Sequence, residues 1–435
     1  MKPQRRRAHD APVVASLVLS MYVCITGFSG CYTVGTPIYD AAISASTTDV
    51  VSVTNGLLNI HNASATTNYS LSSIGCGSPH GDPDVQYDSV SGRWFFTQLA
   101  GTVAPNNPCG TSAVCLSVST GTSPAPPYVQ WYFDKSLFAS TAVAVDQPRL
   151  SVTGNKVAIS ATTCGVGESA TLILNKADLL AGQAVHTTVT HCCTFSHPAR
   201  NLPGYNGLYE VGNPDGQSHS TLRIFVTTGV PGAGGVTTAY VDIPVGYDVF
   251  DPQPHTRAPD GWDVGFATPR NFHSAFNGAL WALTNGENAS GVPRLSLSEF
   301  GNLIPTFNPV LFQTMHQYAP DQGGGIGCEA LAITAADDVV VGFDTVSSSR
   351  YISAYFTGRR HYDALNTIRA PVAVQAGSQP IREASHPTQR LDYCSADTDS
   401  NGVVYSVLQY DGVSASTFGG AAFAEVFFFD PTQFQ

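Results

Sequence analysis

The sequence predicts an all-β protein that folds as a six- or seven-bladed β-propeller with four-stranded antiparallel blades. Its 435 residues include 41 glycines and 28 prolines but only 12% charged residues, while 43% are hydrophobic and 10% aromatic. This composition favours a packed interior over disorder. Short β-branched and aromatic runs alternate with Gly, Pro, Asn and Asp turns, and helix-favouring segments are nearly absent. A strand-opening pattern also recurs at intervals of about 60 residues.

The first 30 residues are typical of an export signal. Three arginines at positions 5–7 precede a mostly apolar stretch at 11–28, and small residues follow at 29–30. A membrane-spanning helix is the competing interpretation, but the apolar stretch is short for the roughly 20 residues that cross a bilayer. We therefore expect a signal peptide over residues 1–30.

The end of this segment, Phe28-Ser29-Gly30-Cys31, resembles the lipobox of bacterial lipoproteins, in which the cysteine is lipidated. Phe28 stands where that pattern usually has Leu, and ordinary cleavage nearby is the alternative. Residues 31–45 are expected to be a short linker and residues 46–435 a single propeller domain. The predicted location is secreted or at the cell surface, with membrane contact only through a lipid on Cys31.

The repeating units begin near residue 82, each with a polar or acidic residue ahead of a short strand. Their openings are Gly81-Asp82-Pro83, Asp146-Gln147-Pro148, a weaker one near Tyr205, Arg270-Asn271-Phe272, Cys328-Glu329-Ala330 and Leu391-Asp392-Tyr393. In the clearest unit, strands are expected at 149–153, 156–161, 171–175 and 186–190. Four short strands joined by turns describe one antiparallel propeller blade.

The ends of the chain leave the number of blades open. Apolar runs at 50–54 and 57–62 flank an Asn55-Gly56 turn, which predicts a hairpin. The last unit, from Asp392 to Phe429, shows only three clear strands. An N-terminal strand that completes this unit would remove two exposed sheet edges and give six blades. If residues 50–75 form a blade of their own, the number is seven.

Segments with a shared layout recur over residues 45–430. They are Gly81-Asp82-Pro83-Asp84-Val85-Gln86-Tyr87-Asp88 with Ser91-Gly92-Arg93-Trp94-Phe95, Asn277-Gly278-Ala279-Leu280-Trp281, Gly342-Phe343-Asp344 with Tyr351-Ile352-Ser353, and Arg390-Leu391-Asp392-Tyr393 with Val403-Val404-Tyr405. These segments resemble the blades of secreted sialidase-like (BNR-type) β-propeller proteins, mostly bacterial and of uncharacterised function. The resemblance implies the fold but no sialidase activity, because Leu222-Arg223-Ile224-Phe225 is not the Phe-Arg-Ile-Pro motif expected of true sialidases.

Ten cysteines occur in the chain. If Cys24 is removed with the signal and Cys31 is lipidated, an even set remains, which suits an oxidising compartment and disulfide bonds. The set is Cys76, Cys109, Cys115, Cys164, Cys192, Cys193, Cys328 and Cys394. Cys109 and Cys115 flank a short loop and are expected to pair. Cys164 ends one strand of a blade, and the adjacent Cys192 and Cys193 end another strand on the same edge. A loop could therefore bring Cys164 close enough to bond one of them.

Acidic residues open four of the predicted innermost strands. These strands begin at the same face of a propeller, so Asp82, Asp146, Glu329 and Asp392 could form a ring around one mouth of the central channel. Close carboxylates repel unless they are protonated or bridged by a cation such as Ca²⁺. The alternative is that each one caps a turn and joins neighbouring blades. Arg149 and Arg270, which also open strands, are further candidate binding residues.

A second candidate calcium site is Asp397-x-Asp399-x-Asn401-Gly402, which matches the start of a calcium loop. The twelfth position is Leu408, where an EF-hand needs a bidentate Glu, and the flanking segments are strands. A tight hairpin turn is the favoured interpretation, and calcium in a loop of another type is the alternative.

Two classes of function fit these features. The net charge of −12 and the scarcity of lysine disfavour a nucleic-acid partner. Because no complete catalytic motif is present, the favoured function is an exported, non-catalytic protein that binds a glycan or protein ligand on one propeller face or serves at the cell envelope. The alternative is a glycan-active hydrolase or lyase that uses the carboxylates predicted at the channel mouth.

Overall fold

The computed structural model describes most of the chain beyond residue 40. The described residues are 33–34, 40–62, 64–77, 80–103, 110–193, 195–214, 219–249, 256–261, 263–266, 273–288, 290–321, 323–378, 389–391, 394–412 and 421–429. The predicted signal peptide, Cys31, Cys109, Arg270 and Asp392 lie outside them.

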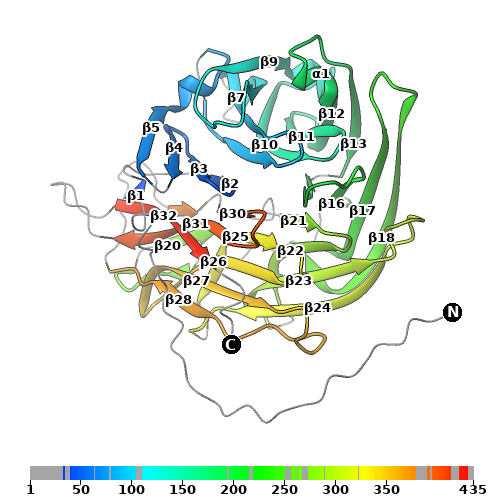
Figure 1. The fold of residues 1–435 in the computed structure, drawn as a ribbon. Coiled ribbons are helices and arrows are strands. Elements are labelled where there is room, and N and C mark those ends of the chain that lie inside the picture. Colours follow the sequence, from blue (N-terminus) through cyan, green and yellow to red (C-terminus); the bar gives the residue numbers. More distant parts are fainter. Residues whose placement is uncertain are drawn as a thin grey trace.

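The described strands form seven four-stranded antiparallel blades (Figure 1). Blade 1 holds β2 (Ala42–Ala45), β3 (Asp49–Val53), β4 (Leu57–Asn62) and β5 (Thr66–Ser70). Blade 2 holds β6 (Asp84–Asp88), β7 (Arg93–Val103), β8 (Thr111–Ser119) and β9 (Tyr128–Asp134). Blade 3 holds β10 (Ala144–Val152), β11 (Lys156–Cys164), β12 (Glu168–Asn175) and β13 (Thr187–Cys192). Blade 4 holds β14 (Phe195–Pro198), β16 (Leu208–Asn213), β17 (His219–Val230) and β18 (Gly235–Val249).

The remaining blades follow the same plan. Blade 5 holds β21 (His273–Phe276), β22 (Leu280–Glu287), β23 (Pro293–Gly301) and β24 (Val310–Tyr318). Blade 6 holds β25 (Gly325–Ile333), β26 (Val339–Ser347), β27 (Arg350–Arg359) and β28 (Val372–Gln375). Blade 7 holds β30 (Ser395–Thr398), β31 (Val404–Gly412), β32 (Ala421–Phe429) and β1 (Thr33–Val34).

A few short elements lie outside these blades. β15 (Arg200–Asn201) pairs in parallel with β21, and β19 (Thr256–Arg257), β20 (Asp263–Phe266) and β29 (Gln389–Leu391) form a small sheet. The helical turns are η1 (Leu71–Ile74), η2 (Lys135–Leu137) and α1 (Lys176–Leu180). None of the helices in the described part of the chain has the length and apolar character needed to cross a membrane.

The seven innermost strands close into a ring. They contact one another in the order β2, β6, β10, β14, β21, β25, β30 and back to β2. Figure 1 shows the blue strands of blade 1 beside the red strands of blade 7. β1 pairs with β32, so an N-terminal strand completes the last blade while β2–β5 form a blade of their own. Both β1 and β2 come from the segment at 31–45 that we expected to be a linker.

The predicted strands of the clearest unit agree with blade 3. Its strands β10 to β13 overlap the four ranges expected from the sequence, and the hairpin expected around Asn55-Gly56 joins β3 to β4. The opening expected near Tyr205 was wrong, because blade 4 begins earlier, at β14. That innermost strand is only four residues long, and its sequence carries no alternating pattern that would mark it.

Apolar side chains fill the spaces between blades. Trp94 and Trp281 are fully buried, each in a separate core cluster between neighbouring blades. Every residue of β26 is buried, because both faces of its blade pack against other blades. Such a strand has a continuous apolar run instead of the alternation of a sheet with one wet face.

Polar side chains near the channel connect neighbouring blades through backbone groups. The Asp84 carboxylate accepts the Leu150 N–H at 2.9 Å, and the Gln86 amide oxygen accepts the Val152 N–H at 2.8 Å. These contacts join blade 2 to blade 3. Asp82 itself takes part in this joining, as the alternative for strand-opening carboxylates proposed, because its carboxylate accepts the Gln147 N–H at 3.2 Å.

Arg200 reaches across the channel from β15. Its guanidinium donates to the Ile43 carbonyl at 2.9 Å, to the Val85 carbonyl at 3.1 Å and to the Asp84 carboxylate at 2.6 Å. It also lies 3.9 Å from a carboxylate oxygen of Asp397. One side chain therefore joins blades 1, 2 and 7 to the loop between β14 and β16 of blade 4, which pairs with β21 of blade 5.

Three disulfides are present among the described residues, and they correct two predicted pairings. Cys115 pairs with Cys76, not with Cys109, because the chain after η1 lies against β7 and β8, where the Gln98 amide of β7 donates to the Gly75 carbonyl at 3.3 Å and the Ser117 hydroxyl of β8 donates to the Ile74 carbonyl. Cys328 pairs with Cys394 and joins the innermost strand of blade 6 to the start of blade 7.

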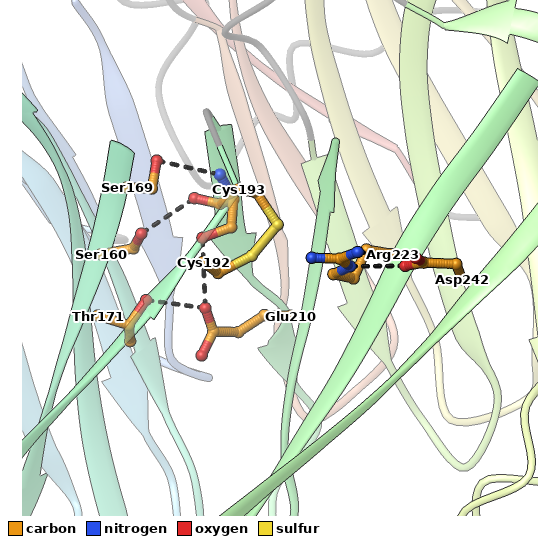
Figure 2. Close-up of a disulfide and its surroundings, with 9 residues drawn as sticks. Ser160, Ser169, Thr171, Cys192, Cys193, Glu210, Arg223 and Asp242 are labelled. Atoms are coloured by element: carbon orange, nitrogen blue, oxygen red, sulfur yellow. Dashed lines mark hydrogen bonds and ion pairs between the residues drawn. A yellow bond between two sulfur atoms is a disulfide. The ribbon is translucent and has the colours of Figure 1, made fainter. Parts of the chain in front are cut away.

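The third disulfide joins the adjacent residues Cys192 and Cys193 at the crossover from blade 3 to blade 4. Cys164 is also disulfide-bonded, but its predicted pairing with these two residues is wrong, because they bond to each other. Figure 2 shows this disulfide above Glu210 of β16, whose carboxylate accepts the Thr171 hydroxyl at 2.8 Å. Burial raises the pKa of Glu210 to about 7.

Disulfides that close long loops should contribute most to stability. Replacing Cys328 and Cys394 by serine removes a disulfide between cysteines that are 66 residues apart in the sequence. This loss should lower the free energy of unfolding by about 4 kcal/mol. The matched change at the adjacent Cys192 and Cys193 removes almost no loop entropy. Urea unfolding of both variants measures the difference, and equal losses would contradict the loop-closure explanation.

Substitution of Arg200 should weaken the whole ring. Arg200→Met leaves the buried Asp84 carboxylate without its guanidinium partner, and such losses cost about 3–5 kcal/mol. The control is Arg223→Met, which breaks a more exposed pair with Asp242 and should cost about 1 kcal/mol or less. Chemical denaturation gives both values, and similar midpoints for the two variants would refute the cross-channel role.

Candidate functional site

The central channel has two mouths, one where the innermost strands begin and one where they end. We call them the start mouth and the end mouth. Of the strand-opening carboxylates predicted from the sequence, the described ones, Asp82, Asp146 and Glu329, belong to the start mouth.

Two of those carboxylates lie close together at the start mouth. The pKa of Asp82 is raised well above its usual value, first by burial and then by the negative charges of Asp40 and Asp146, while Arg149 opposes the rise. The Asn55 side chain donates to Asp40 at 2.6 Å and accepts the Asp82 N–H at 2.8 Å. Asp82 and its neighbours therefore connect blades 1, 2 and 3.

Glu329 does not share this arrangement. Its side chain is 0% exposed, and neither carboxyl oxygen has a hydrogen-bond partner on another described residue. Burial raises the pKa of Glu329 to about 8, although the nearby charge of Arg149 opposes the rise. Burial thus favours the protonated, neutral form of Glu329.

The strand openings differ in phase, so the described carboxylates of the predicted ring do not occupy equivalent positions. Asp82, Gln147 and Cys328 are left-handed residues at comparable places, with φ of 48°, 54° and 47°. Asp82 occupies this position itself, whereas Asp146 precedes it and Glu329 follows it. Similar-looking openings therefore place their carboxylates differently.

The channel behind the start mouth is narrow and crowded with charge. Arg149, Arg200, His197, His273 and Asp84 line a cavity of only about 30 Å³, which has room for a water molecule or two. Burial and the charges of Arg149, His197 and Arg200 hold the pKa of His273 well below its usual value. This section of the channel is too small for a sugar ring.

A larger cavity of about 410 Å³ opens at the end mouth. All seven blades, or the turns that follow their innermost strands, contribute to its lining. We call it the end-mouth cavity. Apart from the predicted calcium loop, the residues of this lining were not predicted as site residues, because Tyr87, Asn201, Tyr205 and Asn277 lie near or beyond strand ends, whereas the other candidates open strands.

Two tyrosines of this lining are held in fixed orientations. The Tyr205 hydroxyl donates to the Asn277 carbonyl at 2.6 Å, and its ring packs edge-on against Phe276. The Tyr87 ring lies 4.8 Å from that of Trp94, measured between centroids. Oriented aromatic rings with polar groups beside them are suited to a ligand that has both apolar faces and hydroxyl groups.

The predicted calcium loop lies at the rim of the end-mouth cavity. One Asp399 carboxylate oxygen accepts the N–H groups of Asn401 and Val403, both at 2.9 Å. Asp397 accepts the Thr398 N–H at 2.9 Å, the Ala45 N–H at 3.3 Å and the Ser44 hydroxyl. The loop is thus the hairpin turn between β30 and β31.

The carboxylates of Asp397 and Asp399, which would be the calcium ligands, thus already accept hydrogen bonds from backbone N–H groups. Among the described residues, the group with three potential metal ligands close together is Cys328, Asp344 and Cys394, and its two cysteines form a disulfide. Calcium binding at Asp397, Asp399 and Asn401 stays a prediction.

The buried acid at Glu329 should make stability depend on pH. Its pKa is about 8 in the folded chain and near 4.5 when unfolded, so the folded state binds one more proton between these values. The free energy of unfolding should therefore fall as pH rises through this window, by about 1.4 kcal/mol for each unit of difference in pKa. Thermal unfolding of wild type and Glu329→Gln from pH 5 to pH 8 measures this slope. A variant with the wild-type slope would contradict the assignment.

Comparisons with known proteins give similarity of fold at low sequence identity. No protein-family model and no curated protein matches the chain. Among solved structures, Hsv2 of Kluyveromyces lactis is similar with a TM-score of 0.42 and 9% identity, over 90% of this chain and 98% of that one. The propeller domain of the Trilobed protease from Pyrococcus furiosus has a TM-score of 0.42 and 9% identity, over 91% of this chain and 96% of that one. A Trypanosoma rangeli sialidase has a TM-score of 0.39 and 9% identity, over 92% of this chain and 59% of that one.

Proposed function

We propose that this chain is an exported, non-catalytic β-propeller that binds a glycan in the end-mouth cavity. The observation that carries this proposal is the cavity of about 410 Å³, to which all seven blades contribute and in which two tyrosines lie among amide, hydroxyl and carboxylate groups. Its volume is typical of a site for a small molecule or for part of an oligosaccharide.

The chemistry of the lining matches a sugar better than an apolar ligand or a flat protein surface. A tyrosine ring can cover the apolar face of a pyranose, while amide and hydroxyl groups bond its edge. Tyr87 and Tyr205 supply rings, and Asn201, Asn277 and Thr398 supply polar groups. A polypeptide ligand is the second candidate, since a single side chain of a partner could also enter.

Catalysis has less support than binding. A glycan hydrolase needs two carboxyl groups that flank a bound sugar, one of them with a raised pKa. Glu329 has the raised pKa but is fully buried, and the cavity near it is too small for a sugar. In the end-mouth cavity, Asp88 pairs with Lys176 at 2.6 Å, and Asp397 and Asp399 bond backbone groups.

Export is supported by the cysteines and by the expected signal segment. None of the described cysteines is free. Disulfide bonds of this kind persist in extracellular and periplasmic compartments. Mass spectrometry of the mature N-terminus would show whether residues 1–30 are removed and whether Cys31 carries a lipid.

A glycan array followed by calorimetry tests the proposed site. Tyr205→Ala removes an aromatic wall of the cavity and should weaken binding of the array-selected glycan. The expected increase in Kd is about tenfold, which corresponds to a loss of about 1.4 kcal/mol of binding free energy. The matched control is Tyr362→Ala, which removes a tyrosine that is 62% exposed on blade 6 and is not part of the cavity lining.

Thermal unfolding of both variants checks that the loss does not come from the Tyr205 contact with Phe276. No glycan binding by the wild type, or equal affinity in the two variants, would argue against this site. Release of a shortened glycan during the assay would favour the hydrolase instead.

A further inference from the structure

We infer that the end-mouth cavity recognises the terminal sugar of a glycan chain and excludes sugars in the interior of the chain. This inference rests on the proposed glycan-binding function and specifies its ligand class. The shape of the cavity carries it: within the described part of the chain, the channel below is narrow and the lining surrounds the axis of the ring. A bound sugar therefore has one way out, through the mouth.

The channel below the end-mouth cavity is too narrow for a sugar. A cavity of about 20 Å³ comes next, because it shares four lining residues with the end-mouth cavity. These are Asn201, Leu202, Asp397 and Thr398. The cavity of about 30 Å³ behind the start mouth follows, since it shares Arg200 and Leu331 with the 20 Å³ cavity. Spaces of these sizes hold a water molecule or two, so the wide mouth ends in a floor.

Arg200 and apolar side chains form this floor. The Arg200 guanidinium donates to the carbonyls of Ile43 and Val85 and to the Asp84 carboxylate, which hold it across the channel. Buried apolar residues line the 20 Å³ cavity beside it: Ala275, Leu331, Ala332, Ile333 and Ala396. Displacing Arg200 would leave the buried Asp84 carboxylate without its cation, which is costly. The floor is thus fixed, and a glycan cannot pass through the channel.

The wall of the cavity includes residues from every blade. Exposed residues of turns or loops in blades 2, 4, 6 and 7 form its rim: Ser89, Pro203, Ala335 and Ser400. Blades 1, 3 and 5, which lie between these in the ring, add Ala45, Thr153 and Asn277. The lining therefore surrounds the channel axis, and the cavity opens at the end mouth.

This shape distinguishes the end of a glycan from its interior. A sugar in the interior of a chain is bonded to a neighbour on each side, and both neighbours would have to leave through the same mouth. One of them would then overlap the wall or the floor. A terminal sugar has a single neighbour, which can point out to solvent. Such a clash rejects the wrong ligand without any new attractive contact to the right one.

A glycan array with paired ligands tests this inference. Each glycan is coupled through its reducing end and printed in two forms, one unmodified and one extended by a single terminal sugar of another type. The glycan selected by the wild-type protein should bind at least about tenfold more weakly after extension, because its recognised sugar is then internal. Calorimetry with short and long soluble chains of the selected glycan should give the same Kd per mole of chain, since each chain has one such end.

Two neighbouring alanines provide a matched pair of variants. Ala335 and Ala336 are both exposed in the turn after β25, but only Ala335 is part of the cavity lining. Ala335→Trp should narrow the mouth and weaken binding of the selected glycan by about tenfold or more, whereas Ala336→Trp should bind within about twofold of wild type. Thermal unfolding of both variants checks that they fold as the wild type does.

The outcomes separate this inference from the proposed function. Unchanged affinity after extension of the selected glycan, or wild-type affinity in a folded Ala335→Trp variant, would overturn terminal recognition in this cavity while leaving glycan binding intact. If neither the array nor calorimetry detects binding of any glycan, the proposed function itself fails.

Discussion

Each blade of this propeller has two apolar faces, and only its neighbours can bury them. Closure of the ring is therefore the constraint on which the other features depend. β1 completes blade 7 from the far end of the chain, and Asp397 of blade 7 accepts hydrogen bonds from Ser44 and Ala45 of blade 1. Arg200 then links blades 1, 2 and 7 across the channel.

Closure gives the two mouths different chemistry. At the start mouth, left-handed residues such as Asp82, Gln147 and Cys328 lie at the openings of several innermost strands, and buried acids and arginines crowd the narrow channel. At the end mouth the turns diverge from the axis and leave a cavity lined by tyrosines and polar groups. The charges of the first mouth stabilise the ring, and the space at the second is available for a ligand.

Much of the fold could be predicted from local pattern. The Asn55-Gly56 hairpin and the strands of blade 3 follow from turn chemistry and β-branched runs, which act over a few residues. The pairing of Cys76 with Cys115 could not be predicted, because it depends on how the segment after η1 crosses a neighbouring strand. The described carboxylates of the predicted acidic ring occupy different positions for a similar reason: one-residue differences in phase redirect side chains at strand openings.

The sequence by itself determined the class of this protein: an all-β chain of repeated antiparallel blades, rich in cysteine pairs, with candidate charges at the strand openings. Periodicity and composition are local properties, so they can be read along the chain. Only the tertiary structure decided the seven blades, the disulfide partners and the position of the cavity. Asn201 and Thr398 are almost 200 residues apart, and ring closure brings both to the lining of one cavity.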